Sequence, residues 1–175
     1  MQLLFPSDAV VVVAGVPGAG KTTLIRRAVD RSEVRVVDTD DRRGEGRRPR
    51  LYAGHYARIV GAILGRRPAV IHSRGTLAAP RRAIALLARL SGRRAHLVLL
   101  DAPRAAAEAG QRRRGRTVPE AEMERQVARW GRLMARIPTG EGWASVVVLN
   151  REQAAATSEL AFIAPVTGKA AAATM

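Results

Sequence analysis

The stretch Val10–Thr23, VVVVAGVPGAGKTT, constrains the fold more than any other part of the chain. Four consecutive valines lead into the glycine-rich segment Gly15–Gly20, which is followed by Lys21, Thr22 and a stretch with helical apolar spacing. A run of β-branched residues predicts a buried strand, and G-x-x-x-x-G-K-T between a strand and a helix is typical of a phosphate-binding loop. We therefore expect the rest of the chain to be a scaffold around this loop.

Each residue type in the loop suits a bound triphosphate. Glycines allow backbone dihedrals and close approaches that side chains prevent, so the N–H groups of the loop can converge on an anion. Lys21 is predicted to reach the β- and γ-phosphates, and the Thr22 hydroxyl is predicted to bind Mg²⁺. The expected nucleotide-binding residues are Gly15, Pro17, Gly18, Ala19, Gly20, Lys21, Thr22 and Thr23. ATP with Mg²⁺ is the expected ligand, because no guanine-reading NKxD set is visible and ATP is the default.

Strand and helix patterns alternate along the whole chain. Strands are expected over about 9–14, 34–38, 69–73, 95–100 and 144–149. Helices are expected over about 21–30, 51–65, 80–90 and 119–136. Two further helices are expected to begin at about residues 103 and 151. This alternation predicts an α/β fold in which helices cover both faces of a parallel sheet. We expect one domain over residues 1–163 and a flexible tail over residues 164–175.

Acidic residues follow the second predicted strand. Asp38, Asp40 and Asp41 lie where that strand ends, and ligands of open parallel sheets bind beyond the carboxyl ends of the strands. A carboxylate there can accept a proton from an attacking hydroxyl or hold a magnesium-bound water. Asp40 is the predicted base, and Asp38 is the alternative base or a partner of the metal. The competing interpretation is a turn with ordinary solvated acids.

The third predicted strand ends in His72-Ser73-Arg74 and carries no acid. The Ser73 hydroxyl can orient a water on Mg²⁺, more weakly than a carboxylate would. His72 is expected to be packed or hydrogen-bonded rather than catalytic. For Arg74, a contact with substrate or phosphate and a structural role stay equally open.

The chain is strongly basic, with a net charge of +15. All but two of the 30 basic residues are arginine, and the exceptions are Lys21 and Lys169. An arginine-rich, alanine-rich composition also arises from a GC-rich genome, so the total charge alone does not indicate an anionic partner. The preference for arginine makes the lysine at position 21 informative about phosphate binding. A compact ammonium can follow a phosphate where a planar guanidinium fits poorly.

Arginines cluster at two places. Arg112–Arg116 lies between helices after the fourth strand, and such arginines on a lid (about 110–120) can clamp transferring phosphates; a solvated basic turn is the alternative. One face of the next helix carries four arginines, Arg125, Arg129, Arg132 and Arg136. Residues 42–50 are expected to form an exposed, mobile loop. Together, the arginines of this helix face and of this loop could steer an anionic substrate. Nucleic acid is possible but not favoured, because no aromatic residues that stack bases are interleaved.

Several classes of protein and site are excluded or disfavoured by composition. The chain has no cysteine, so disulfides and thiolate sites are excluded. No apolar run approaches the roughly 20 residues of a membrane span, and residues 1–13 lack the basic start of a signal peptide. We expect a cytoplasmic protein that does not interact with membranes, and a monomer.

With GVPGAGKTT, Asp38-x-Asp40 and the arginine-rich segment after the fourth strand, the chain resembles P-loop kinases. It is most similar to the AAA-type "predicted kinase" group, which is related to zeta toxins and polynucleotide 5′-kinases. The resemblance implies a three-layer P-loop NTPase fold, with a five-stranded parallel sheet in the order 2-3-1-4-5. Ser73 stands where many members have Asp, and Gly110 stands where a first lid arginine is often found.

The resemblance also implies an activity, namely transfer of the γ-phosphate of ATP or GTP to a hydroxyl of an acceptor that the sequence does not name. It assigns catalytic roles to Lys21, Asp40 and Arg114, with Arg112 and Arg116 as neighbours that contact the nucleotide. Two alternatives stay open. One is a nucleotide-binding switch or pseudo-kinase, and the other is a nucleic-acid 5′-hydroxyl kinase.

Overall fold

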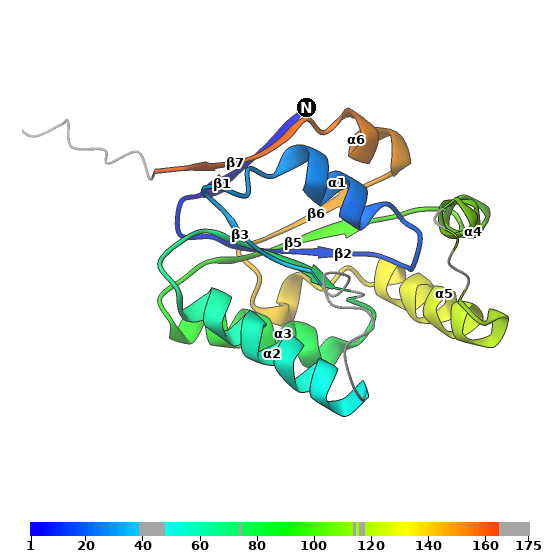
Figure 1. Cartoon of the computed structure of the whole chain (residues 1–175), viewed down its shortest axis with the longest axis horizontal. Coiled ribbons are helices and arrows are strands. Elements are labelled where there is room, and N and C mark those ends of the chain that lie inside the picture. The colour runs from blue at the N-terminus through cyan, green and yellow to red at the C-terminus, as the bar shows by residue number, and fades with distance from the viewer. Residues whose placement is uncertain (39–47, 74, 114, 116–117, 165–175) are drawn as a thin grey trace, which may run out of the picture.

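Strands and helices alternate along the chain, as the sequence predicts (Figure 1). The computed structural model describes residues 1–38, 48–73, 75–113, 115 and 118–164. The strands are β1 (Gln2–Pro6), β2 (Val10–Ala14), β3 (Arg35–Val37), β4 (Ala69–Ser73), β5 (Ala95–Leu100), β6 (Ser145–Leu149) and β7 (Glu159–Ile163). The helices are α1 (Lys21–Ala28), α2 (Arg48–Leu64), α3 (Ala78–Leu90), α4 (Arg104–Arg112), α5 (Glu120–Ala135) and α6 (Arg151–Ala156), with a short 3₁₀ helix, η2 (Thr139–Glu141).

The valine-rich strand β2 lies at the centre of a five-stranded parallel sheet. The strand order is β3-β4-β2-β5-β6, which confirms the predicted order 2-3-1-4-5 of the five predicted strands. Val12 of β2 lies opposite Ile71 of β4 and Leu97 of β5. Every residue of β2 is buried, since both faces of the sheet are covered, and this explains the absence of polar residues in the strand.

Helices cover both faces of this sheet and give the molecule three layers (Figure 1). Val11 and Val13 point to the α1 side, where they join a buried cluster with Leu24 and Ile25. The alternate β2 side chains point to the opposite side, in a cluster with buried residues of α2, α3 and α5. The loop after β2 therefore starts from a strand that is packed on both faces.

The sequence does not predict β1 and β7, which form a separate two-stranded parallel sheet. Gln2 lies opposite Glu159, and Phe5 lies opposite Phe162. Phe5 and Leu160 are buried in the cluster on the α1 side. Each strand has only five residues, and its partner lies at the other end of the chain. A local apolar pattern cannot reveal such a pairing.

Helix α2 begins earlier than the sequence predicts. Residues 48–50, assigned to a loop, belong to this helix, so that part of the prediction is wrong. Residues 42–47 of the predicted loop and 165–175 of the predicted tail lie outside the described residues. Within the described ranges, no helix combines the length and apolar character needed to cross a membrane.

Candidate nucleotide site

The glycine-rich loop joins the end of β2 to the start of α1, at the carboxyl edge of the sheet. Gly18 and Gly20 have φ values of 86° and 97°, in the left-handed region that favours glycine. Gly20 directly precedes α1, and the first turn of α1 contains no acidic residue. An anion in the loop would therefore meet the N–H groups at the start of α1 without competition from a carboxylate of that turn.

The side chain of Lys21 lies inside the loop. Only 6% of the residue is exposed, and Nζ donates hydrogen bonds to the carbonyl oxygens of Gly15 at 2.7 Å and Val16 at 2.9 Å. Thr22, the next residue of α1, is also buried, whereas Thr23 is exposed. A buried cation in a glycine-rich loop at the start of a helix fits the phosphates of ATP, and a threonine hydroxyl beside it fits Mg²⁺.

Helix α4 packs directly on this loop. A Cβ atom at Gly18 would lie 1.9 Å from the carbonyl oxygen of Ala107, and one at Gly110 would lie 2.5 Å from the carbonyl oxygen of Gly18. No side chain fits at either place without a shift of backbone. This explains why Gly110 stands where the resemblance would place an arginine: the backbone of the phosphate loop occupies the space.

Gln111 is a site residue that the sequence analysis missed. Its side chain is buried, and its Nε2 donates to the carbonyl oxygen of Pro17 at 3.4 Å while its Oε1 accepts the N–H of Val118 at 2.9 Å. It therefore connects the loop to the segment that leads into α5. A glutamine beside a run of arginines gives no signal of this role in the sequence.

Gly110 and Gly131 form a matched pair of helical glycines that tests the packing of α4 on the loop. Gly110→Ala is expected to destabilise the protein by about 1–3 kcal/mol, because the new methyl group overlaps the backbone of Gly18. Gly131→Ala in α5 is expected to be neutral or to stabilise by up to about 1 kcal/mol, since a Cβ there meets nothing within 4 Å. Urea unfolding of the two variants measures both effects, and equal shifts would contradict the close approach.

A buried acid lies at the same edge of the sheet. Asp38 directly follows β3 and is 1% exposed, and its Oδ1 contacts Nδ1 of His72 in β4. His72 is thus packed and hydrogen-bonded, as expected. Burial lowers the pKa of the neighbouring His55, the charge of Arg58 lowers it further, and the charge of Asp38 partly offsets both. The magnesium role predicted for Asp38 stays a prediction.

The segment after β4 is fixed against the central strand. The Ser73 hydroxyl accepts the N–H of Gly75 at 3.1 Å. Gly75 has φ 66°, and a Cβ atom there would lie 2.3 Å from the Cβ of Ala14 at the end of β2. The Ser73 side chain thus shapes the turn beside the loop, and its action on a metal-bound water stays a prediction.

Four of the predicted site residues lie outside the described residues: Asp40, Arg74, Arg114 and Arg116. Their roles stay predictions. Arg112 is the last residue of α4, so 110–112 of the predicted lid are helical. Arg112 is exposed, and together with Gln111 it lines a cavity of about 270 Å³ between α4 and the start of α5.

Comparison with solved structures shows which known proteins have a similar fold. A gluconokinase from Sinorhizobium meliloti 1021 matches with a TM-score of 0.60 and 16% identity, over 85% of this chain and 86% of that chain. A structure of the PezAT toxin–antitoxin system of Streptococcus pneumoniae matches with a TM-score of 0.63 and 12% identity, over 87% of this chain and 71% of that chain. Kti12 from Chaetomium thermophilum, in complex with ADP-AlF3, matches with a TM-score of 0.54 and 18% identity, over 81% of this chain and 88% of that chain.

At these identities the likeness shows a shared fold. Together with the loop, this fold defines a P-loop kinase-like NTPase. The chain belongs to the family described as "AAA domain", whose model matches residues 10–133. No curated protein matches the chain in sequence.

Proposed function

We propose that this protein is a phosphotransferase that moves the γ-phosphate of ATP to a hydroxyl group of an acceptor. The observation that carries the proposal is the buried ammonium of Lys21, held by loop carbonyls at the start of α1. A gluconokinase and a nucleotide-bound Kti12 share the fold, and this supports nucleotide-dependent phosphate transfer.

The proposed roles rest on the positions of the described residues and, for Asp40, Arg114 and Arg116, on the resemblance to P-loop kinases. The N–H groups of the loop and the Lys21 ammonium hold the phosphates, and Thr22, with Asp38 as partner, would hold Mg²⁺. When bound, Mg²⁺ supplies positive charge at the phosphate oxygens. Asp40 accepts the proton of the acceptor hydroxyl, and Arg114 stabilises the charge that develops during transfer, with Arg112 and Arg116 beside it.

Asp40→Asn separates the chemical step from nucleotide binding. We expect kcat to fall by about 10²–10⁴-fold, because the general base is lost, while the Kd for Mg·ATP changes by less than about twofold, since no phosphate contact is removed. ADP formation across a panel of hydroxyl acceptors measures the first effect, and isothermal titration measures the second. Asp41→Asn is the control, because Asp41, which also lies outside the described residues, is expected to face solvent or a basic neighbour. Unchanged turnover in Asp40→Asn would refute the role.

A nucleotide-binding switch without acceptor phosphorylation is the second candidate. It is favoured by Ser73, whose hydroxyl accepts the N–H of Gly75 at a position where a carboxylate would assist magnesium. Such a protein would bind ATP and form no additional ADP with any acceptor. If Ser73→Asp raised transfer to an acceptor that the natural protein ignores, the switch would be the better description.

A further inference from the structure

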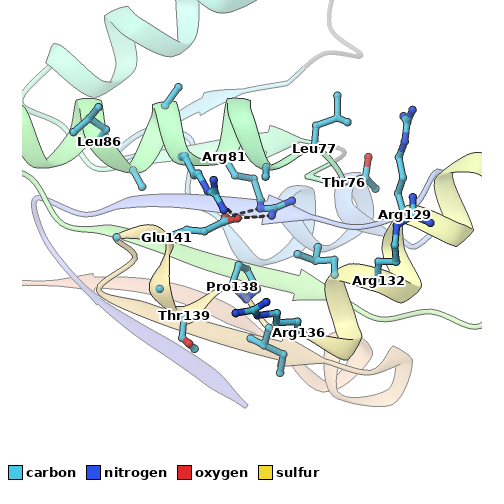
Figure 2. A pocket seen from close by; sticks show the side chains of 18 of the residues that line it. Thr76, Leu77, Arg81, Leu86, Arg129, Arg132, Arg136, Pro138, Thr139 and Glu141 are labelled. Atoms are coloured by element: carbon cyan, nitrogen blue, oxygen red, sulfur yellow. Dashed lines mark hydrogen bonds and ion pairs between the residues drawn. The ribbon is translucent and has the colours of Figure 1, made fainter.

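A groove of about 1280 Å³ lies between α3, α5 and the segment 137–142 (Figure 2). Its residues come from these elements, from the residues that flank the two helices and from the turn after β4, rather than from the glycine-rich loop. Figure 2 shows Arg129 and Arg132 of α5 with Arg136, directly after α5, on one side, and Leu86 of α3 with Leu77, directly before α3, on the other. We call it the arginine groove.

The rims of the arginine groove are positively charged. The exposed lining residues include Arg82 and Arg89 of α3, Arg132 of α5, and Arg136 directly after α5. Arginines seven residues apart on a helix lie about 10 Å from each other along its axis. Arg89, Arg132 and Arg136 have no carboxylate partner in the part of the chain that the structure describes. Their charges are therefore open to an anionic partner.

The single acidic residue among the described lining residues is already neutralised. Glu141 accepts hydrogen bonds from Arg81, with Nε to Oε2 at 2.9 Å and Nη2 to Oε1 at 2.7 Å. Arg81 also donates to the carbonyl oxygen of Gly75, so this buried pair ties α3 to η2 and to the turn after β4. The groove is thus held in shape by internal contacts, which lowers the entropic cost of filling it.

Apolar side chains are exposed between the charged rims. Leu77, Leu86 and Ile137 are 51%, 49% and 41% exposed, and all three line the groove. Among the described lining residues there is no aromatic side chain on which a base could stack. A nucleic-acid backbone would meet the arginines but leave the leucines uncovered, whereas an amphipathic helix with acidic flanks would cover both.

We propose that the arginine groove docks an acidic amphipathic helix of a partner protein. A helix with its side chains is about 10–12 Å across, so roughly three turns occupy a volume of this size. Leucine-type residues on one face of the helix meet Leu77, Leu86 and Ile137, and carboxylates on its flanks meet the two arginine rims. The chain's own residues 165–175 contain Lys169 and no acidic side chain, so they do not supply such a helix.

Binding of a synthetic peptide tests the proposal. The probe is a fluorescein-labelled helix of about 14 residues, with leucines at i, i+3, i+4 and i+7 and glutamates elsewhere. We expect saturable binding by fluorescence anisotropy, and at least about tenfold weaker binding of a scrambled peptide of the same composition. The double variant Arg132→Glu/Arg136→Glu and the single variant Leu86→Asp should each weaken binding by at least about tenfold.

The matched control is Arg31→Glu/Arg151→Glu, which removes the same charge at two exposed arginines outside the groove. It should change peptide affinity by less than about twofold at physiological salt. Equal binding of the scrambled peptide, or equal losses in the groove and control variants, would overturn the proposal. So would a single-stranded oligonucleotide that displaces the peptide and binds more tightly, since the groove would then be a nucleic-acid site. The measurement needs no nucleotide, so its outcome is independent of phosphate transfer.

Discussion

Lys21→Ala is expected to weaken the binding of Mg·ATP by at least about 100-fold and to reduce phosphate transfer below detection. The ammonium is buried within the loop, and it sits 2.7 Å and 2.9 Å from the carbonyl oxygens of Gly15 and Val16. Its removal takes away the positive charge that we propose faces the phosphates, and it leaves the carbonyl oxygens of Gly15 and Val16 without their charged donor. We therefore expect both the affinity for the nucleotide and the shape of the loop to depend on this one group.

Isothermal titration with Mg·ATP measures the affinity, and urea unfolding without nucleotide separates a loss of affinity from a loss of folding. Arg26→Ala is the matched control, because Arg26 is a cation on the exposed side of the same helix, α1. We expect it to bind ATP like the natural protein. Lys21→Arg should also bind poorly, since a planar guanidinium does not fit the place of a compact ammonium. Undiminished binding in Lys21→Ala would refute the assignment of the site.

The sequence predicts the loop and central sheet well because their signals are local. The valine run Val10–Val13 predicts a strand buried on both faces, and the glycines before Lys21 predict a turn. The strand order came with the resemblance to P-loop kinases, and the pairing of β2 with β4 and β5 agrees with it. By contrast, β1 and β7 carry five residues each and are stabilised by pairing across the length of the chain, which no local pattern encodes.

The contacts within the site depend on distances that a sequence does not contain. Asp38 is recognisable as an acid at the end of a strand, but its contact with His72 depends on the register between β3 and β4. In the sequence, Gly110 is only a departure from the arginine that the resemblance would place there. The structure gives a reason, because α4 packs on the loop and the backbone of Gly18 excludes a side chain at position 110. In the same way, the arginine face of α5 is visible in the sequence, and the groove opposite it is not.

The structure also assigns a purely structural role to one arginine of this arginine-rich chain. Arg93, just before β5, is buried, and burial lowers its pKa, partly offset by the charge of Asp8. Nη1 donates to three carbonyl oxygens at the end of α2, those of Ala62, Ile63 and Gly65, at 2.7–2.8 Å. The remaining donors bind the carbonyl oxygens of Asp8, Ala9 and Arg67. One guanidinium thus caps α2 and holds its end against the start of β2.

Arg93→Met is therefore expected to lower the free energy of unfolding by about 3–5 kcal/mol, because a side chain of similar length leaves buried carbonyl oxygens without donors. For a chain of this size that corresponds to a fall in Tm of roughly 6–20 °C. Arg93→Lys should recover part of the loss, since an ammonium has three donors in place of five. Arg94→Met is the control: its exposed side chain lies 3.6 Å from Asp8, and such a surface pair contributes less than about 1 kcal/mol. Thermal and urea unfolding measure all three variants, and a loss in Arg93→Met no larger than in Arg94→Met would show that the carbonyl cluster does not need its guanidinium.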